Sequence, residues 1–476
     1  MSSGADAEPG ATSTTPKADA AGTTPADPSG AQPGLRADLV AGALSVGLVA
    51  VATAVGFWLR VRLSGPPHFP GAPRTFGEWP VLGEWLPHWG PGTPLALLIA
   101  AAAVGCGPGL AARLPWRRAL AGGYLLAVAW AFALALVDGW QRGVAARLST
   151  RDEYVHAVPG IGDIPEFLRT FTSRILDGQP DSLITHVAGH PPGATLVFVW
   201  LDRIGLAGGA WAGVVCVLVA GAAAVAVPVT VAALGRPDQA RAALPFVALL
   251  PGAVWVGVSA DALFAGVTAI GIALLALAAR RGRVALGVAA GLVLGFGIFL
   301  SYGLVLLAPI ALSMVWRLRS WQVLVAAAAG ALAVVVAFAV AGFWWLDGYH
   351  LVLERYRQSV AGVRPYGYWV WADLACLVLA VGPAAAAGLR RAVPAMMATA
   401  LRPRSAVALL VGAAATGVSA ATLSGLSKAE VERIWLPFAV WLAAGGALLP
   451  ASTRRGWLAA GAVLALLVNH VLLTNW

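Results

Sequence analysis

Apolar runs long enough to cross a lipid bilayer recur along almost the whole of this chain. About 20 consecutive apolar residues span the hydrocarbon core as a helix. Only 11% of the 476 residues are charged, and the mean hydropathy is +0.78, whereas a soluble domain carries roughly a quarter charged residues. The sequence therefore predicts an all-α polytopic membrane protein.

We expect a bundle of about 13 transmembrane helices, each near the length that a bilayer requires. Their predicted bounds are 38–60, 95–112, 119–140, 209–234, 242–258, 261–279, 284–300, 302–316, 321–343, 368–388, 405–423, 434–449 and 456–474. Residues 1–36 are rich in Pro, Ser, Thr, Gly and Asp and contain no hydrophobic signal core. This composition predicts a disordered cytoplasmic tail before a transmembrane domain over 37–476.

The apolar segment 192–206 is expected not to cross the membrane. As a helix it reaches about 22 Å, and its Asp202 and Arg203 would each cost roughly 2.5–3.5 kcal/mol near mid-membrane. When this segment is left out, the arginine clusters between the other spans all fall on the cytoplasmic side, as the positive-inside rule requires. The sequence thus predicts a multi-pass protein of a bacterial plasma membrane with a cytoplasmic N-terminus. Heavy use of Ala, Gly and Arg suggests a high-GC, actinobacteria-like source.

This topology places nearly all acids after residue 38, and all seven histidines, on or near the outer face. Positive-inside sorting explains why arginines are few there, but it does not act on histidine. We therefore expect any chemistry to be extracytoplasmic, in the loops 141–208, 344–367 and 424–433. The formal charge of +10 does not indicate nucleic-acid binding, because the arginines lie in short clusters between apolar runs.

The loop 141–208 contains an acidic pair directly after the third span and three histidines. The segment 163–177 has apolar residues at spacings of three and four, which predicts an amphipathic helix lying on the bilayer. Pro191-Pro192 then opens the short interfacial helix, since proline suits the first turn. The candidate site residues of this loop are Asp152, Glu153, His156, His186 and His190.

The two other outer loops contain cations where the topology does not require them. In one, arginines alternate with Tyr and Trp, a pattern that suits a lipid-linked phosphate bearing a ring-shaped group; an ordinary interfacial anchor is the alternative. In the other, Arg433 heads an apolar helix and opposes its dipole unless an anion or a Glu lies near. A binding role and a structural ion pair both stay open. The candidates are Arg357, Arg364, Tyr366, Glu430, Glu432 and Arg433.

The stretch "RDEYVHAVPG…HVAGHPPGATLVFVWLDRIG" resembles the GT-C superfamily of polyprenyl-phosphate-sugar-dependent glycosyltransferases, in the branch of protein O-mannosyltransferases and lipid A aminoarabinose transferases. The likeness covers roughly residues 119–345 and comprises the acidic pair, a His-Pro-Pro element and a later Asp that begins a span. These elements are Asp152-Glu153, His190-Pro191-Pro192 and Asp261. Two spans, instead of one, precede the helix that leads to the acidic pair. The family's Thr-Lys-Gly appears here as Ser301-Tyr302-Gly303, so phosphate recognition passes to Arg357, Arg364 or Arg433.

The resemblance implies an inverting transfer of a sugar from a polyprenyl-phosphate donor to a hydroxyl of an extracytoplasmic glycan, glycolipid or protein. Asp152 would take the acceptor proton, with Glu153 as its neighbour, and cations would stabilise the departing phosphate. Tyr302, Asp261 and the histidines would bind substrate. No cofactor is required, and a divalent cation held by the histidines with Asp152 is an open alternative. Besides donor and acceptor, the partners are membrane lipids.

Two functions of other classes are the alternatives. A transporter or flippase of a lipid-linked substrate would place ionisable residues near the bilayer midplane and often shows inverted repeats. We find no clear internal repeat, and the middle spans are nearly free of charge. A catalytically inactive assembly protein of the same fold would tolerate the loss of Asp152.

Overall fold

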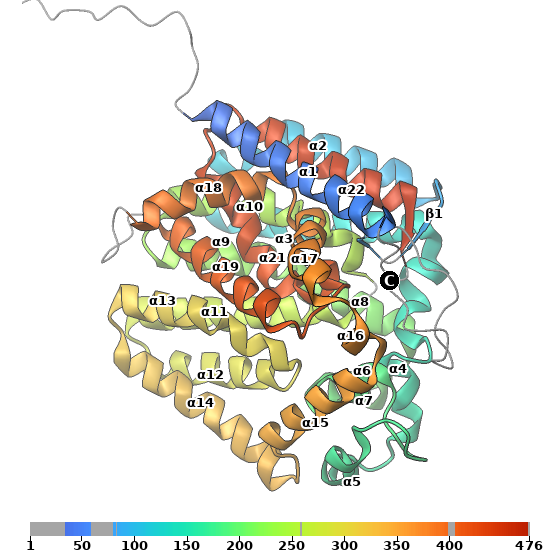
Figure 1. The fold of residues 1–476 in the computed structure, drawn as a ribbon. Coiled ribbons are helices and arrows are strands. Elements are labelled where there is room, and N and C mark those ends of the chain that lie inside the picture. The colour runs from blue at the N-terminus through green and yellow to red at the C-terminus, as the bar shows by residue number, and fades with distance from the viewer. Residues whose placement is uncertain (1–33, 59–79, 82, 258, 398–404, 475–476) are drawn as a thin grey trace, which may run out of the picture. The chain divides into compact units, whose positions relative to one another are not determined.

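The structure is a computed structural model that describes residues 34–58, 80–81, 83–257, 259–397 and 405–474. The expectation of a disordered tail falls almost wholly on residues 1–33, which lie outside the described residues. The chain divides into a short unit, Met1–Leu35, and a compact unit, Arg36–Trp476. The following description concerns the second unit (Figure 1).

Among the described residues, seven helices are long and apolar enough to cross a bilayer, and a bent pair gives an eighth candidate crossing. They correspond to seven of the predicted spans and confirm an all-α polytopic membrane protein. They are α1 (Leu35–Trp58), α2 (Gly92–Arg113), α3 (Trp116–Ala135) continued by the 3-10 turn Leu136–Asp138, α8 (Gly208–Gly221) continued by α9 (Ala223–Ala233), α11 (Ala260–Arg281), α14 (Trp321–Val340) and α19 (Ala406–Ser424).

The other predicted spans are shorter or interrupted helices. Prolines account for several of the interruptions, because proline cannot donate a backbone hydrogen bond and favours the first turn of a new helix; Pro237, Pro251 and Pro437 all lie in first turns. These segments are α10 (Pro237–Ala248) with the 3-10 helix Pro251–Trp255, α12 (Val284–Ile298), the 3-10 helix Tyr302–Leu307 with α13 (Ala308–Leu318), α20 (Val431–Ile434), α21 (Leu436–Ala443) with the 3-10 helix Ala444–Leu448, and α22 (Arg454–Val471).

The predicted span 368–388 is not a straight helix. It is split into α17 (Tyr366–Val381) and α18 (Pro383–Met397), which meet at an angle of 108°. Gly382 joins them with φ +75°, a left-handed conformation that glycine adopts without strain, and Pro383 begins the second helix. The predicted span 368–388 is therefore interrupted by a bend at Gly382.

The loop between α3 and α8 folds into short helices that gather with α15 and α16 at one end of the unit (Figure 1). The segment predicted not to cross forms α7, whose 12 residues reach about 18 Å, which confirms a short helix there. Gly193 lets α7 approach the chain after α12, since a Cβ atom would lie 2.5 Å from the Phe299 carbonyl oxygen. The elements are a π-helix (Gln141–Ala145), 3-10 turns (Arg147–Ser149, Val158–Gly160 and Thr172–Arg174), α4 (Tyr154–Ala157), α5 (Ile164–Thr170), α6 (Thr185–Gly189), α7 (Pro192–Arg203), α15 (Trp345–Gln358) and α16 (Val360–Val363).

The predicted amphipathic helix over 163–177 is shorter than expected and packs on protein. Its helical part is α5, and the apolar side chains of the stripe, Phe167, Phe171 and Ile175, are buried within the protein. Phe171 contacts Phe343 edge-to-face at 5.4 Å between ring centroids. The apolar side chains of this stripe are therefore buried against the protein core rather than against the bilayer, because the α14–α15 connection packs beside them.

A two-stranded antiparallel ribbon adds a small β element to the all-α fold. The strand β1 (Gly83–Trp85) pairs with β2 (Leu472–Thr474), which follows the last helix. The side chains of Arg142 and Arg147 both donate to the Thr474 carbonyl oxygen, at 3.2 and 2.8 Å. The predicted span 456–474 thus ends as a strand fastened to the segment that leads into the candidate site.

The helix α11 has opposite charge at its two ends. It is packed among α8, α9, α12 and α21, begins with Asp261 and ends with Arg280 and Arg281. Its 22 residues separate the two ends by about 33 Å, close to the hydrocarbon thickness of a bilayer. The acidic end adjoins the short helices described above, so polar chemistry and the basic connections lie on different sides of the span.

Candidate functional site

The site is built on the first turn of α11. Ser259 caps this helix: its Oγ accepts from the Asp261 backbone N–H at 3.0 Å and donates to Asp261 Oδ2 at 2.7 Å. The Asp261 carboxylate is almost fully buried. The dipole of the helix favours an anion at this end, but burial of a carboxylate needs a paired cation to offset the loss of hydration.

Arg433 supplies that cation from α20. Its Nη1 donates to Asp261 Oδ2 at 2.8 Å, and its Nη2 donates to Glu430 Oε2 at 2.8 Å and lies 3.2 Å from His186 Nε2. Burial disfavours the charged guanidinium, but Asp261 and Glu430 outweigh it and raise the pKa of Arg433. One arginine with a fixed fork of donors thus connects three segments that are far apart in sequence.

His186 extends this network to the acidic pair. Its Nδ1 lies 3.1 Å from Glu153 Oε1, and Glu153 is buried. Donation from Arg433 to Nε2 requires that Nε2 carry no proton, so the proton of the neutral ring is on Nδ1 and faces Glu153. Burial lowers the pKa of His186 and the Glu153 carboxylate raises it, with a net rise; a second proton on Nε2 would break the contact with Arg433. We call Glu153, His186, Asp261, Glu430 and Arg433 the Arg433 cluster.

Aromatic rings close one side of the Arg433 cluster. Tyr154, the residue after the acidic pair, is buried and lies against His186, His190 and Phe198, with ring centroids 6.1, 5.7 and 5.4 Å away. His190 donates from Nδ1 to the His186 carbonyl oxygen at 2.9 Å, and burial lowers the pKa of its imidazole. His190 therefore stays neutral at neutral pH and fixes the one-turn α6 that presents His186.

Asp152 differs from its neighbour Glu153 because its side chain is exposed. Its Oδ1 accepts from Thr185 Oγ1 at 3.1 Å, and its carbonyl oxygen accepts from the His186 backbone N–H at 3.1 Å. These bonds hold the acidic pair against the start of α6. Of the two predicted catalytic acids, Glu153 is part of the ion-pair network, and Asp152 is the one exposed to solvent.

A strained turn positions Glu430 and Arg433. Ala429 and Glu430 have φ of +67° and +63°, and such left-handed backbone in residues other than glycine costs on the order of 1–3 kcal/mol each. Asp373 of α17, which is almost fully buried, accepts from the Ala429 backbone N–H at 3.0 Å. Asp373 thus holds the turn in the conformation that directs Glu430 and Arg433 toward α11.

Two more cations fasten the same turn. Arg364 donates to Glu430 Oε1 at 3.1 Å and to the Lys428 carbonyl oxygen, and Lys428 Nζ donates to the Arg364 carbonyl oxygen at 2.8 Å. Burial by itself raises the pKa of Glu430, but Arg364 and Arg433 outweigh it and lower the value to about 2. Glu430 is therefore ionised at any pH at which the protein functions, and it balances both arginines.

Glu432, the other charged residue of α20, does not share in the ion pairs of Arg433. It has no exposed surface, and neither carboxylate oxygen has a hydrogen-bond partner among the described residues. Burial, and to a smaller extent the neighbouring Glu430, raises the pKa of Glu432 to about 7. The side chain is thus held between its neutral and charged forms near physiological pH, outside the Arg433 cluster.

Four predicted site residues lie elsewhere. His156 is exposed. Arg357 is exposed and pairs with Glu354 at 3.2 Å, and Tyr366 is exposed at the start of α17. Tyr302 is buried against aromatic rings of α15, which is a packing role. The structure thus brings together Glu153, His186, His190, Asp261, Arg364, Glu430 and Arg433, with Asp152 at their edge.

Sequence reasoning missed Tyr154, Ser259 and Asp373. A signal was present for two of them: Ser259 precedes the predicted Asp at a helix start, as an N-cap does, and Asp373 is a lone acid in an apolar run, where an ionisable residue usually has a function. No local pattern indicated that Asp373 accepts a hydrogen bond from a turn 56 residues away.

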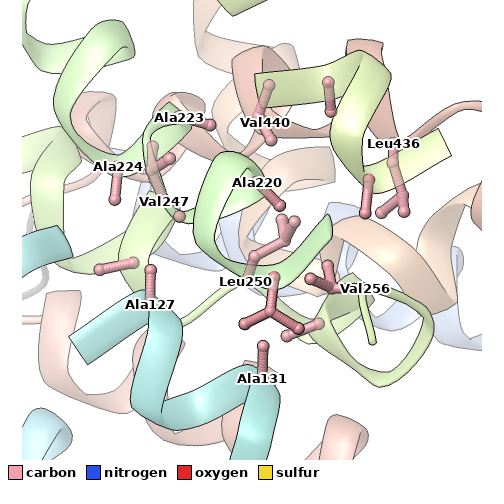
Figure 2. A pocket seen from close by; sticks show the side chains of 16 residues that line it. Ala127, Ala131, Ala220, Ala223, Ala224, Val247, Leu250, Val256, Leu436 and Val440 are labelled. Atoms are coloured by element: carbon pink, nitrogen blue, oxygen red, sulfur yellow. The ribbon is translucent and has the colours of Figure 1, made fainter. Parts of the chain in front are cut away.

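An apolar cavity of about 40 Å³ lies between α3, α8, α9, α10, α11 and α21 and is lined by Ala, Val, Leu and Gly alone. Figure 2 shows these short apolar side chains pointing into the space from several helices. Within the described ranges, no three His, Cys, Asp or Glu side chains converge as metal ligands would; the acids of the site converge on Arg433.

The arrangement provides an exposed carboxylate beside a buried ion-pair network, at the end of a helix of span length. An exposed carboxylate so held is suited to take a proton from a bound hydroxyl. Comparisons of the sequence with protein-family models and with curated proteins gave no match.

Proposed function

We propose that the protein is a membrane glycosyltransferase of the GT-C kind, which transfers a sugar from a polyprenyl-phosphate donor to an extracytoplasmic acceptor hydroxyl. The observation that carries this proposal is the convergence of the three elements of the family resemblance. The acidic pair, the His-Pro-Pro element and the later Asp are connected through His186 and Arg433. Glu153 and His190 both lie against His186, and Arg433 joins His186 to Asp261. A chance likeness between separate motifs gives no reason for them to meet in space.

The number of membrane segments, their orientation and the location of the protein are also part of this proposal. The bundle would comprise about 13 membrane segments, in which the bent pair α17–α18, the short helices α10, α12, α13 and α21, and the helix α22 complete the seven long spans. The acidic end of α11 would face outward and its basic end the cytoplasm, by the positive-inside rule. The N-terminus would then be cytoplasmic and the site extracytoplasmic, in the plasma membrane of a bacterium.

In the proposed reaction Asp152 is the general base. Its carboxylate takes the proton of the acceptor hydroxyl while the hydroxyl oxygen forms a bond to the anomeric carbon. The bond from that carbon to the phosphate oxygen breaks on the opposite face, and the phosphate leaves with the electron pair, so the configuration inverts. Glu153 acts through His186 as a positioning residue, because its carboxylate is buried and already engaged.

The phosphate of the donor needs a cation. The three candidate arginines differ in how far acidic side chains already neutralise them. Arg433 is neutralised by Asp261 and Glu430, and Arg364 by Glu430. Arg357 is the most exposed of the three, and its ion pair with Glu354 is a solvent-exposed one of small value. We assign the donor phosphate to Arg357 on α15, which packs on the α6 segment, and a role in holding the site together to the other two.

The test is to compare Asp152→Asn with Glu153→Gln in membranes supplied with a labelled polyprenyl-phosphate sugar. Asp152→Asn should abolish transfer without lowering the yield or thermal stability of the protein, because its side chain is exposed. Glu153→Gln should lower stability as well, since Glu153 is buried beside His186. Glu166→Gln, an exposed acid on α5, is the matched control and should behave as wild type.

Near-normal transfer by Asp152→Asn would remove Asp152 from the mechanism. Transbilayer movement of the intact labelled lipid, without sugar transfer, in wild type and Asp152→Asn alike would identify a flippase instead. Comparing the lipids of a deletion strain with those of wild type gives the sugar, because the unused polyprenyl-phosphate sugar should accumulate.

A further inference from the structure

A second pocket lies at the basic end of the bundle, away from the Arg433 cluster. It has a volume of about 220 Å³ and opens between α2, α10 and the start of α22. Its walls combine apolar and charged side chains, chiefly Pro108, Asp238, Arg241, Pro245, Phe246 and Arg454.

The two arginines of this pocket have only uncharged hydrogen-bond partners. Arg241 Nη1 donates to the carbonyl oxygens of Ala111 and Leu114 at 2.7 and 2.8 Å. Arg454 donates from Nε to Leu449 O at 3.0 Å and from Nη2 to Ala447 O at 2.8 Å. Both side chains are half-buried, and in the described part of the chain neither forms a salt bridge.

The one acid that lines the pocket does not neutralise these arginines. Both carboxylate oxygens of Asp238 accept from Arg236, at 3.1 and 2.8 Å. Burial lowers the pKa of Arg454, and the charge of Asp238 opposes this effect only in part. Elsewhere at a helix end, by contrast, Arg390 and Arg391 are both paired with the carboxylate of Asp38.

Two half-buried guanidinium groups without a counter-anion favour the binding of an anion between them. Each guanidinium has five N–H donors, so both keep donors beyond their bonds to helix-end carbonyls. The position of the pocket indicates which kind of anion it binds. Pro108 lies near the end of α2, a helix of span length, so the pocket is at the level where lipid headgroups lie. Pro245 and Phe246 give it an apolar wall.

We propose that this pocket binds the phosphate of an anionic membrane lipid. The phosphate oxygens accept from Arg241 and Arg454, and the glycerol backbone and first acyl carbons lie along Pro108, Pro245 and Phe246. A basic pocket between membrane helices is a known type of anionic-headgroup site. This inference does not depend on the proposed glycosyltransferase activity.

The experiment uses the full chain purified in a neutral detergent, with thermal unfolding as the measurement. Phosphatidylglycerol should raise the unfolding temperature by about 3 °C when present at roughly 100 times its Kd. Phosphatidylcholine and inorganic phosphate at the same concentration should not. The same shift with inorganic phosphate would show a free-phosphate site, and the same shift with phosphatidylcholine a general lipid effect; either overturns the proposal.

The variant Arg241→Gln/Arg454→Gln should lose the shift caused by phosphatidylglycerol, whatever its own unfolding temperature. Arg455→Gln is the matched control, because Arg455 is the next residue, is exposed and does not line the pocket. A shift retained in the double variant overturns the proposal. Should the double variant not fold, a photoactivatable phosphatidylglycerol is applied to the wild-type protein. Labelling of peptides containing 108–116 or 241–246 supports the site, and labelling elsewhere overturns it.

Discussion

Replacement of Glu432 by Gln should stabilise the protein at alkaline pH and leave it unchanged at acid pH. Burial raises the pKa of Glu432 from an ordinary 4.5 to about 7. The folded protein therefore holds a proton on this group that the unfolded chain releases between pH 4.5 and 7. Stability falls as pH rises through this window and stays low above it, because the buried carboxylate is then charged.

The size of the effect follows from the shift in pKa. One unit corresponds to about 1.4 kcal/mol, so the raised pKa of Glu432 lowers the stability of the wild-type protein, relative to low pH, by about 3 kcal/mol at pH 8 and about 1 kcal/mol at pH 5. Gln resembles the protonated carboxyl in shape and never ionises. An unfolding entropy of about 2.1 cal/mol/K per residue gives roughly 1 kcal/mol/K for 476 residues. Glu432→Gln should then unfold about 3 °C above wild type at pH 8.

The assay is thermal unfolding of both proteins in the same detergent from pH 4.5 to 8.5. The difference between them reports on Glu432 and on the groups that its charge influences, such as Asp373, since every other residue is the same in both proteins. Glu166→Gln serves as the control and should show no pH-dependent difference, because its side chain is exposed. A difference between Glu432→Gln and wild type that is constant with pH, or that favours wild type at pH 8, would refute the reasoning.

The remaining predictions concern the turn at Ala429 and two of the candidate arginines. Asp373→Ala should lower stability by about 1–3 kcal/mol and reduce sugar transfer, because the buried Ala429 N–H loses its acceptor; Ala429→Gly should be neutral or stabilising, because glycine relieves the positive φ. Arg433→Lys should lower both stability and transfer, since an ammonium cannot reproduce the fork between Asp261 and Glu430. Arg357→Ala should weaken donor binding alone, and equal unfolding temperatures for the two arginine variants would contradict this division of roles.

The sequence determined much of the fold because membrane insertion is governed by local apolarity. The long spans, among them α11 and α14, are read from runs of apolar residues, and α7 was recognised as too short to cross. The bend after α17 had a signal that the prediction did not use, the Gly382-Pro383 dipeptide, which marks turns. The apolar pattern of 163–177 was also read, but a helix cannot reveal from its own sequence whether protein or lipid covers its stripe.

The candidate site was only partly predictable. The charged residues of the site could be named in advance because they lie in the loops between the predicted spans, on the side where the predicted topology places few arginines. Which of them pair did not follow, because ion pairs such as Arg433 with Asp261 join residues 172 positions apart. The sequence likewise left open whether Arg433 binds a ligand or forms an ion pair, and the structure pairs it with two acids.

What the sequence by itself determined is an all-α chain with several helices long and apolar enough to cross a membrane; the gathering of its acids and histidines on one face is a prediction from the topology. The tertiary structure alone decided that Glu153 is buried and Asp152 exposed, and that Asp373 holds a strained turn. It also decided that Glu432 is buried with no hydrogen-bond partner among the described residues. The physical reason is that hydropathy acts on each segment separately. Hydrogen bonds and burial of single side chains depend on neighbours that only the folded chain supplies.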